Sequence, residues 1–209
     1  MTARDHVLGR IRDALGPAPA VPDVPRDYRP AGSEQSGSPE LVERFCRRVA
    51  EYQATVLRTT EDELPATIAG ACAARGSRRL LAAPGVSWAV PGVEVADDGP
   101  GVAIAELDAV DGALTGCALA IAETGTVVLD GGPACGRRAL TLVPDHHVCV
   151  VRGDQVVAGV PDAVAALSAA AAEGRPITFV SGPSATSDIE LQRVEGVHGP
   201  RKLDVVVVA

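Results

Sequence analysis

Short apolar runs alternate with amphipathic stretches along most of the chain. Runs typical of buried strands occupy residues 54–58, 78–84, 93–97, 146–151 and 203–208, with a short strand predicted at 155–157. Helical spacing of apolar residues is found at 39–52, 60–74, 105–110 and 161–172. This alternation predicts an α/β fold, in which helices cover both faces of a largely parallel sheet.

One pair of apolar runs departs from this alternation. Residues 117–122 and 126–129 flank Glu123–Thr124–Gly125, which reads as a tight connection between antiparallel strands. The expected architecture is therefore a three-layer α/β domain with a mostly parallel sheet and one antiparallel hairpin. Buried at the tip of that hairpin, Glu123 is expected to have a raised pKa and to act as a base or nucleophile. An ordinary polar turn is the alternative.

The N-terminal part of the chain has a different pattern. Residues 1–15 contain an amphipathic helix over 3–15, with Thr2 as its N-cap and Gly16–Pro17 as its stop. Residues 16–39 contain six prolines and no periodicity, so they read as an extended, partly disordered arm. The globular domain is expected over 40–209, with Ser38 capping its first helix. The N-terminal helix either folds back onto this domain or docks on a partner.

Composition excludes several classes of function. The net charge of −8 argues against a nucleic-acid or anionic-membrane surface. The apolar runs are too short for a membrane span and the first residues do not form a signal peptide, so a cytoplasmic location is expected. Lys202 is the only lysine, which makes Schiff-base chemistry unexpected, and the sequence has no phosphate-binding GxxxxGK loop.

The five cysteines are far apart in the sequence and form no CxxC pair. This spacing supports neither a zinc site nor an iron–sulfur cluster, and predicts reduced, mostly buried thiols. Asp145, His147 and Cys149 fall on one face of a strand, but residues on one strand face diverge, so a metal site is not expected. No cofactor is predicted in this chain, and redox centres would lie on other chains.

The stretch Ser181–Pro200 carries most of the candidate chemistry. It follows the apolar run 176–180, read as a buried strand, and loops at the ends of such strands often bind ligands. Gly182 and Pro183 shape a tight exit from the strand. A short helix is expected to begin at Asp188, capped by Ser187 and Glu190, and its free N–H groups with Ser184 and Thr186 form an anion seat. Capping and turn formation alone are the alternative.

Two other motifs remain open. His198 lies between glycines in the loop that leads to the last strand, where it is either an acid, base or metal ligand or simply a surface residue. Arg137 and Arg138 follow the glycine-rich GGPACG segment, where they either bind an anion or solvate the start of a helix.

The segments ALTGCALAIAETGTVVLD, TLVPDHHVCVV and SGPSATSDIELQRVEGVHGP resemble the LutC/YkgG family, lactate-utilisation C proteins with a LUD domain. The resemblance covers about residues 40–209. It implies a fold like NagB/RpiA/CoA transferases and 5-formyltetrahydrofolate cyclo-ligase. It also implies membership of a three-protein system that oxidises L-lactate to pyruvate, with iron–sulfur clusters on separate partner chains. The residues matching the shared motif are Glu123, Thr124, Gly125, Ser181, Gly182, Pro183, Ser184, Thr186, Asp188, Glu190, His198, Gly199 and Pro200.

Three functions follow from these observations. The first is an accessory subunit of an iron–sulfur lactate-oxidising system, which binds a small carboxylate or a partner chain at residues 181–200. The second is an independent CoA-transferase- or sugar-phosphate-isomerase-like enzyme that uses Glu123. The third is a purely structural interaction module.

Overall fold

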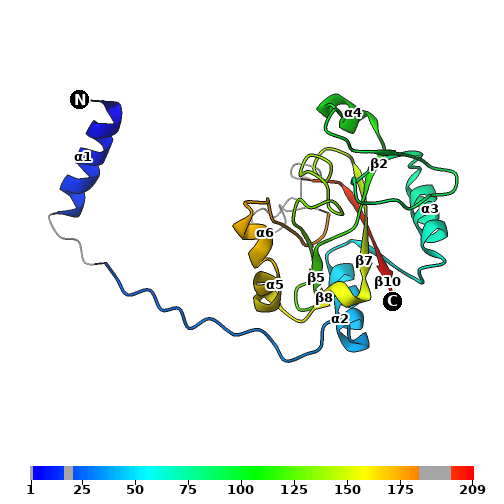
Figure 1. Ribbon diagram of the computed structural model, residues 1–209, viewed down its shortest axis with the longest axis horizontal. Coiled ribbons are helices and arrows are strands. Elements are labelled where there is room, and N and C mark those ends of the chain that lie inside the picture. Colours follow the sequence, from blue (N-terminus) through cyan, green and yellow to red (C-terminus); the bar gives the residue numbers. More distant parts are fainter. Residues whose placement is uncertain (1, 17–20, 184–198) are drawn as a thin grey trace.

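The computed structural model describes residues 2–16, 21–183 and 199–209 of the chain. Two sheets form the centre of the fold (Figure 1). The larger sheet has six parallel strands in the order β1-β10-β7-β4-β2-β3, and the smaller has four in the order β8-β5-β6-β9. The larger sheet consists of β1 (Thr55–Thr59), β10 (Lys202–Val208), β7 (His146–Arg152), β4 (Gly112–Thr115), β2 (Arg79–Ala82) and β3 (Glu94–Asp97).

The smaller sheet is mixed: β6 is antiparallel to both β5 and β9, and β8 is parallel to β5. Its strands are β8 (Val156–Val157), β5 (Leu119–Ile121), β6 (Thr126–Leu129) and β9 (Thr178–Val180). The helices are α1 (Ala3–Leu15), α2 (Pro39–Glu51), α3 (Leu64–Arg75), α4 (Ile104–Ala109), α5 (Val160–Ala166) and α6 (Ser168–Ala172), with a 3-10 turn at Gly153–Gln155. The predicted α/β class, the mostly parallel sheet and the antiparallel hairpin are confirmed.

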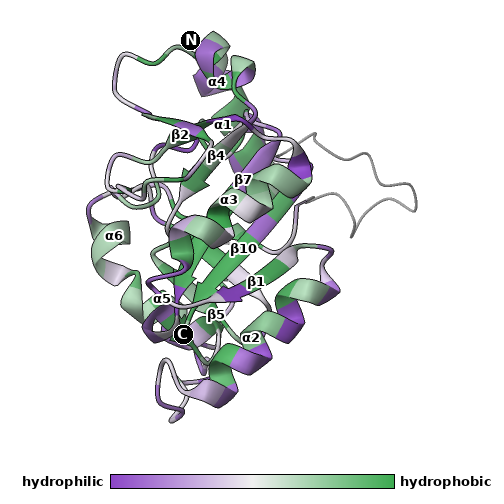
Figure 2. Ribbon diagram, turned by 90° about the vertical axis from the view of Figure 1, so that its right-hand side faces the viewer, coloured by the Kyte–Doolittle hydropathy of each residue, from purple (hydrophilic) through white to green (hydrophobic). Residues whose placement is uncertain are grey.

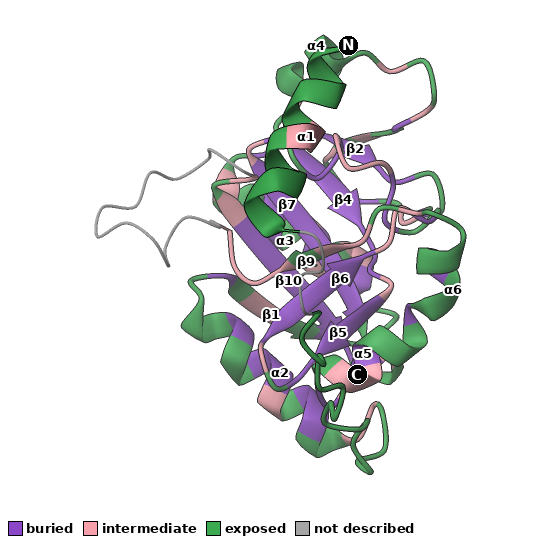
Figure 3. Cartoon of the chain, turned by 90° about the vertical axis from the view of Figure 1, so that its left-hand side faces the viewer, coloured by how far each residue is buried: buried purple, intermediate pink, exposed green. Residues whose placement is uncertain are grey.

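Alternation along β10 shows how the layers are held together. Val205 and Val207 pack with α2 and the small sheet, whereas Val206 and Val208 pack with α3 on the other face. A third apolar cluster joins the small sheet to α5. Burying an aliphatic side chain stabilises a fold by about 1.5–3 kcal/mol. The clusters on the two faces of the large sheet contain most of these buried side chains. Figures 2 and 3 show the apolar, buried strands between helices whose outer faces are exposed.

The structure corrects several details of the predicted elements. The hairpin does not extend the parallel sheet but belongs to the separate small sheet, which adds a layer. Strand β4 was not predicted; its first residue is a glycine because a Cβ there would lie 2.6 Å from the carbonyl oxygen of His146. The predicted helix over 161–172 breaks at Leu167 into α5 and α6.

Three local predictions, about the burial of a strand, the start of a helix and the apolar stripe of another helix, were also wrong. The run 176–180 is not a buried strand: β9 lies at the edge of the small sheet and Phe179 is 49% exposed. The helix predicted from residue 60 begins only at Leu64, as α3, and no side chain caps it. Tyr52, expected on the apolar stripe of α2, is 45% exposed, although Leu41, Phe45 and the rest of the stripe are buried.

The N-terminal helix α1 forms as predicted. The Oγ1 atom of Thr2 accepts a hydrogen bond from the N–H of Asp5, and the Asp5 carboxylate accepts one from the N–H of Thr2. The helix ends at Gly16 and contributes no buried residue. Residues 21–38 contain neither helix nor strand and connect to α2 (Figure 1). Within the described ranges, no helix is long and apolar enough to cross a membrane.

Candidate functional site

Two motifs far apart in the sequence meet at the end of the small sheet. Strand β6 begins just after the Glu123–Gly125 turn, and its pairing with β9 places Val127 opposite Val180. The hydroxyl groups of Thr126 and Ser181 consequently lie 2.6 Å apart, and Thr126 also lies 2.7 Å from the hydroxyl of Thr124. A chain of three hydroxyls therefore joins the hairpin turn to the start of the Ser181–Pro200 stretch.

Both motifs also rest on the last turn of α2. Gly125 has φ of +60°, and a Cβ there would lie 2.6 Å from the carbonyl carbon of Arg48. Gly182 has φ of +83°, and a Cβ there would lie 2.6 Å from the carbonyl oxygen of Tyr52. Glycine is required at both positions, because a side chain would strain the backbone and collide with α2. Their predicted ligand-binding role is thus accompanied by a clear packing role.

Beside Ser181 lies a cavity of about 100 Å³. A water molecule needs only about 10–15 Å³ measured in this way, so the cavity has room for a small molecule. Five residues of the Ser181–Pro200 stretch lie on its wall: Ser181, Gly182, Pro183, Gly199 and Pro200. The rest of the wall, among the described residues, is formed by Arg138, Thr141, His147, Thr178, Phe179, Val180 and Leu203.

Arg138 places a guanidinium group in this wall. Its Nη1 atom donates hydrogen bonds to the carbonyl oxygen and the Oγ1 of Thr141, at 3.0 and 3.2 Å. Burial lowers the pKa of Arg138 below its ordinary value, because desolvation disfavours the charged form. A guanidinium remains protonated at neutral pH in spite of such a shift. The cavity therefore combines a cation with hydroxyl groups, a set suited to a carboxylate.

His147 contributes a neutral imidazole to the same wall. The ring is buried, and its Nε2 atom lies 2.7 Å from Oγ1 of Thr115. Burial lowers the pKa of His147 to about 3, with smaller effects from His146 and Arg138. At neutral pH the ring is uncharged, so it can donate or accept a hydrogen bond but does not act as a cation.

The predicted strand-face set of Asp145, His147 and Cys149 does not converge. The Asp145 carboxylate pairs with Arg201 and Lys202, while the Cys149 thiol faces the carbonyl of Gly116. Among the residues that the structure describes, no group of three or more His, Cys, Asp or Glu side chains could hold a metal ion. All five cysteines are buried and free, as predicted. Burial raises the pKa of Cys72 to about 11 and that of Cys135 to about 12, so both are neutral thiols at pH 7.

Glu123 does not have the raised pKa that its place in the hairpin predicted. Its carboxylate forms a two-point ion pair with Arg29 of the arm, at 3.0 and 2.7 Å. This pairing, helped by the backbone N–H of Val160, lowers the pKa of Glu123. The side chain is 42% exposed rather than desolvated, which explains why the predicted direction was wrong. Glu123 lines a second cavity, of about 340 Å³, between the arm, α2 and the start of α5.

The other candidates divide into two groups. Ser184, Thr186, Asp188, Glu190 and His198 lie outside the described residues. Arg137, considered as an anion-binding residue, instead holds the buried Asp98 carboxylate at 2.7 and 2.9 Å and donates to the carbonyl of Val102. Sequence reasoning missed Thr141 and the contribution of His147 to the cavity. The signal for this part of the wall was the neighbouring Arg138, which the sequence offered as an anion-binding residue.

Comparison with known proteins shows which family this chain resembles. The family model of the LUD domain matches residues 42–208. A protein from Deinococcus radiodurans called lactate utilization protein C is 50% identical over 171 residues, which cover 81% of this chain and 80% of that protein. A protein of the same name from Geobacillus kaustophilus is 29% identical over 234 aligned positions, covering 98% and 95% of the two chains.

A solved structure supports the same assignment. The crystal structure of a DUF162 family protein from Deinococcus radiodurans has a TM-score of 0.72 and 42% sequence identity to this chain. The match covers 84% of this chain and 100% of the other. With the family model spanning both sheets and the cavity between them, this chain belongs to the LUD domain family and is a homologue of lactate utilization protein C.

Proposed function

We propose that this protein is a lactate utilization protein C-like subunit of an iron–sulfur system that oxidises L-lactate to pyruvate. In this proposal the chain carries no redox group and binds a small carboxylate next to Ser181. The observation that carries the proposal is the cavity in which Arg138 lies with two hydroxyl residues, Thr141 and Ser181, in a homologue of lactate utilization protein C.

The chemistry of the cavity suits a 2-hydroxy or 2-oxo acid. A guanidinium binds a carboxylate through charge-assisted hydrogen bonds, and hydroxyl groups hydrogen-bond to a neighbouring oxygen of either acid. Phe179, Val180 and Leu203 supply apolar surface for the remaining carbon atoms. The described part of the wall contains no cysteine, and burial raises the pKa of the Cys72 and Cys135 thiols, which makes them poor cluster ligands. In this proposal the iron–sulfur clusters therefore belong to partner chains.

The experiment is reconstitution with the proteins encoded next to this chain. We expect lactate-dependent dye reduction by the co-purified assembly, and a large loss when this chain is omitted. Arg138→Gln should reduce the activity and weaken lactate binding measured by calorimetry on this chain. Arg79→Gln is the matched control, because Arg79 lies at the far side of the sheet and pairs only loosely with Glu94, at 3.7 Å. Unchanged activity without this chain would contradict the proposal.

An independent CoA-transferase- or sugar-phosphate-isomerase-like enzyme is the second candidate, because Glu123 does line a cavity large enough for a substrate. The ion pair with Arg29 counts against it, since a paired carboxylate with a lowered pKa is a weak base. Turnover of an acyl-CoA or sugar phosphate by the isolated chain, lost in Glu123→Gln, would favour this alternative over the first.

A further inference from the structure

Part of the proline-rich arm lies across the domain as a strap, which we define as residues 29–37. Its first contact is the ion pair of Arg29 with Glu123, and its second is a hydrogen bond from the N–H of Gly32 to Asp162 Oδ1, at 2.9 Å. Glu34 then forms a two-point pair with Arg44 on α2, at 3.1 and 2.9 Å. The strap thus connects the hairpin turn, the start of α5 and α2.

These contacts are all polar and lie at the surface. Residues 29–36 are exposed, so the strap buries no apolar side chain. Exposed ion pairs contribute little stability each and weaken further in salt, while ordering several residues costs conformational entropy. The closed strap is consequently only marginally favoured, unlike the apolar core below it.

The C-terminal end of the strap is held differently. The N–H of Gly37 donates to the carbonyl of Val156 at 2.9 Å, and a Cβ on Gly37 would lie 2.9 Å from Cα of Asp154. Backbone therefore packs against backbone here, next to the first turn of α2. Gly37 has φ of +76°, a conformation that glycine adopts without strain. This end of the strap is anchored to the domain through its backbone.

Glu123 is the acceptor on which the other end closes. A Cβ on Gly159 would lie 2.9 Å from Glu123 Oε2, so the glycine leaves the space that the carboxylate occupies. The carboxylate is thereby held at the start of α5, facing Arg29. Beneath the strap lies the cavity of about 340 Å³, whose wall includes Arg44, Arg48 and Glu123.

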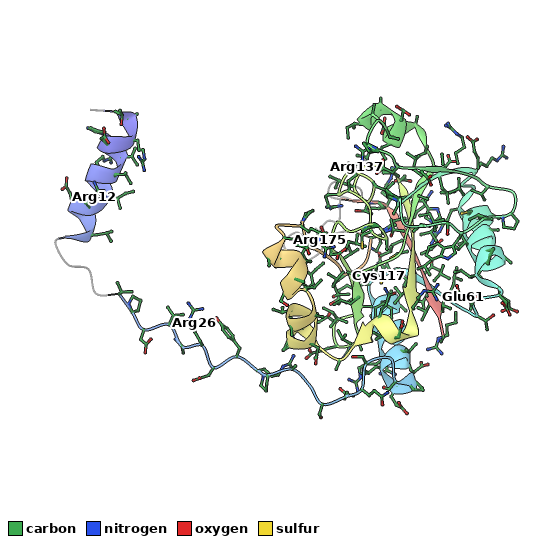
Figure 4. All side chains as sticks on the ribbon, viewed as in Figure 1. Arg12, Arg26, Glu61, Cys117, Arg137 and Arg175 are labelled. Atoms are coloured by element: carbon green, nitrogen blue, oxygen red, sulfur yellow. The ribbon has the colours of Figure 1, made fainter. Side chains whose placement is uncertain are left out.

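We propose that the strap is an electrostatic latch, which turns about Gly37 and alternates between a closed state on Glu123 and an open state. When closed, it occupies Glu123 and Arg44 and covers their cavity, so a ligand or protein that uses this face must displace it. When open, it frees these side chains and lengthens the connection between α1 and the domain by the length of the strap. Arg12 and Arg26, labelled in Figure 4, lie on the part of the chain that would gain this freedom.

Hydrogen exchange of the Gly32 and Gly37 amides in the full-length chain tests the latch. We expect Glu123→Gln and Arg29→Gln to speed exchange at Gly32 by up to about fivefold, the effect of losing an exposed ion pair worth up to about 1 kcal/mol. Raising sodium chloride from about 0.05 to about 0.5 M should act in the same direction, because the strap contacts are screened. Gly37, at the anchored end, should change less than Gly32 in every case.

Glu51→Gln is the matched control. It breaks the Arg48–Glu51 pair on α2, the helix that carries Arg44, but it removes no contact of the strap. Exchange of the β10 amides, measured in the same samples, shows whether each variant keeps its fold. The proposal is overturned if Gly32 exchanges at the same rate in Glu123→Gln as in the natural chain. It is equally overturned if Gly32 and Gly37 exchange only together with the β10 amides, since the strap would then be an integral part of the domain.

Discussion

Thr126 and Ser181 are 55 positions apart in the sequence, yet their side-chain oxygens lie 2.6 Å from each other. The contact exists because β6 and β9 are antiparallel neighbours, so the start of one strand meets the end of the other. It joins the hairpin turn to the loop that borders the candidate cavity. Part of the motif shared with the family thus has a structural explanation, which mutagenesis can separate from any role in binding.

We expect Ser181→Ala to lower the free energy of unfolding by about 1 kcal/mol, because it removes one part-buried hydrogen bond. Thr126→Val should lower it by more, because it removes the contacts with both Thr124 and Ser181. The double variant should lose less than the sum of the two single losses, since both remove the same contact. Urea denaturation of the four proteins completes the cycle. Losses that add within about 0.3 kcal/mol would show that the two hydroxyls are not coupled.

Gly182→Ala and Gly125→Ala should each destabilise the protein by more than about 2 kcal/mol. Alanine would have to adopt the left-handed backbone conformation, and its Cβ would also collide with the backbone at the end of α2. Two controls separate these causes. The first control is Gly92→Ala, because Gly92 has φ of +74° but open space around it. The second is Gly99→Ala, because Gly99 has open space and no positive φ. Thermal melts should rank the losses as Gly182 and Gly125 first, then Gly92, then Gly99.

Much of the fold could be predicted because its signals are local. The stripe from Leu41 to Val49, the apolar run 203–208 and the turn at Glu123–Gly125 each follow from spacing within one segment. The division into two sheets could not be predicted in this way, since it depends on β9 pairing with β6 rather than joining the parallel strands. Strand β4 was missed because Gly112 reads as a turn residue, although it is needed for close pairing with β7.

The candidate site was less predictable for the same reason. Glu123 was expected to be desolvated, but its environment depends on Arg29, 94 positions away. His147 was considered on a strand face where no metal site was expected, but its partner, Thr115 on the neighbouring strand, was not predicted. Side-chain pairing across long separations leaves no periodic signal, so these roles become visible only in the folded chain.

A buried polar network on the α3 face of the large sheet predicts that acid lowers the stability of the fold. Asp204 accepts hydrogen bonds from Arg75 at 2.9 Å and pairs with Nε2 of His146 at 3.1 Å, while Nδ1 of His146 lies 2.9 Å from the Ser77 hydroxyl. Desolvation opposes ionisation of Asp204, but these partners outweigh it and lower its pKa to about 2, from 3.8.

Because the folded pKa of Asp204 is depressed, its contribution is fully present above about pH 4 and is lost as pH falls towards 2. The size is about 2 kcal/mol. Asp204→Asn should lower stability at neutral pH and remove this part of the acid dependence. Urea titrations at pH 2 to 5 provide the measurement, with the exposed Asp13→Asn on α1 as the control. An unchanged slope in Asp204→Asn would contradict the assignment.

His147 should contribute to the pH dependence of stability in a higher range. Its folded pKa of about 3 lies below the ordinary value of 6.5, because the buried ring resists protonation. The unfolded chain therefore binds a proton that the folded chain rejects, and stability falls as pH decreases from about 6.5 towards 3. The slope is at most about 1.4 kcal/mol per pH unit from this one group. His147→Gln keeps a hydrogen-bonding side chain for Thr115 but cannot be protonated, so it should flatten the dependence of stability on pH between pH 4 and 6. The control is His6→Gln on the exposed face of α1, which should leave this dependence unchanged. If the slope between pH 4 and 6 is the same in His147→Gln as in the natural chain, the buried neutral imidazole is not its source.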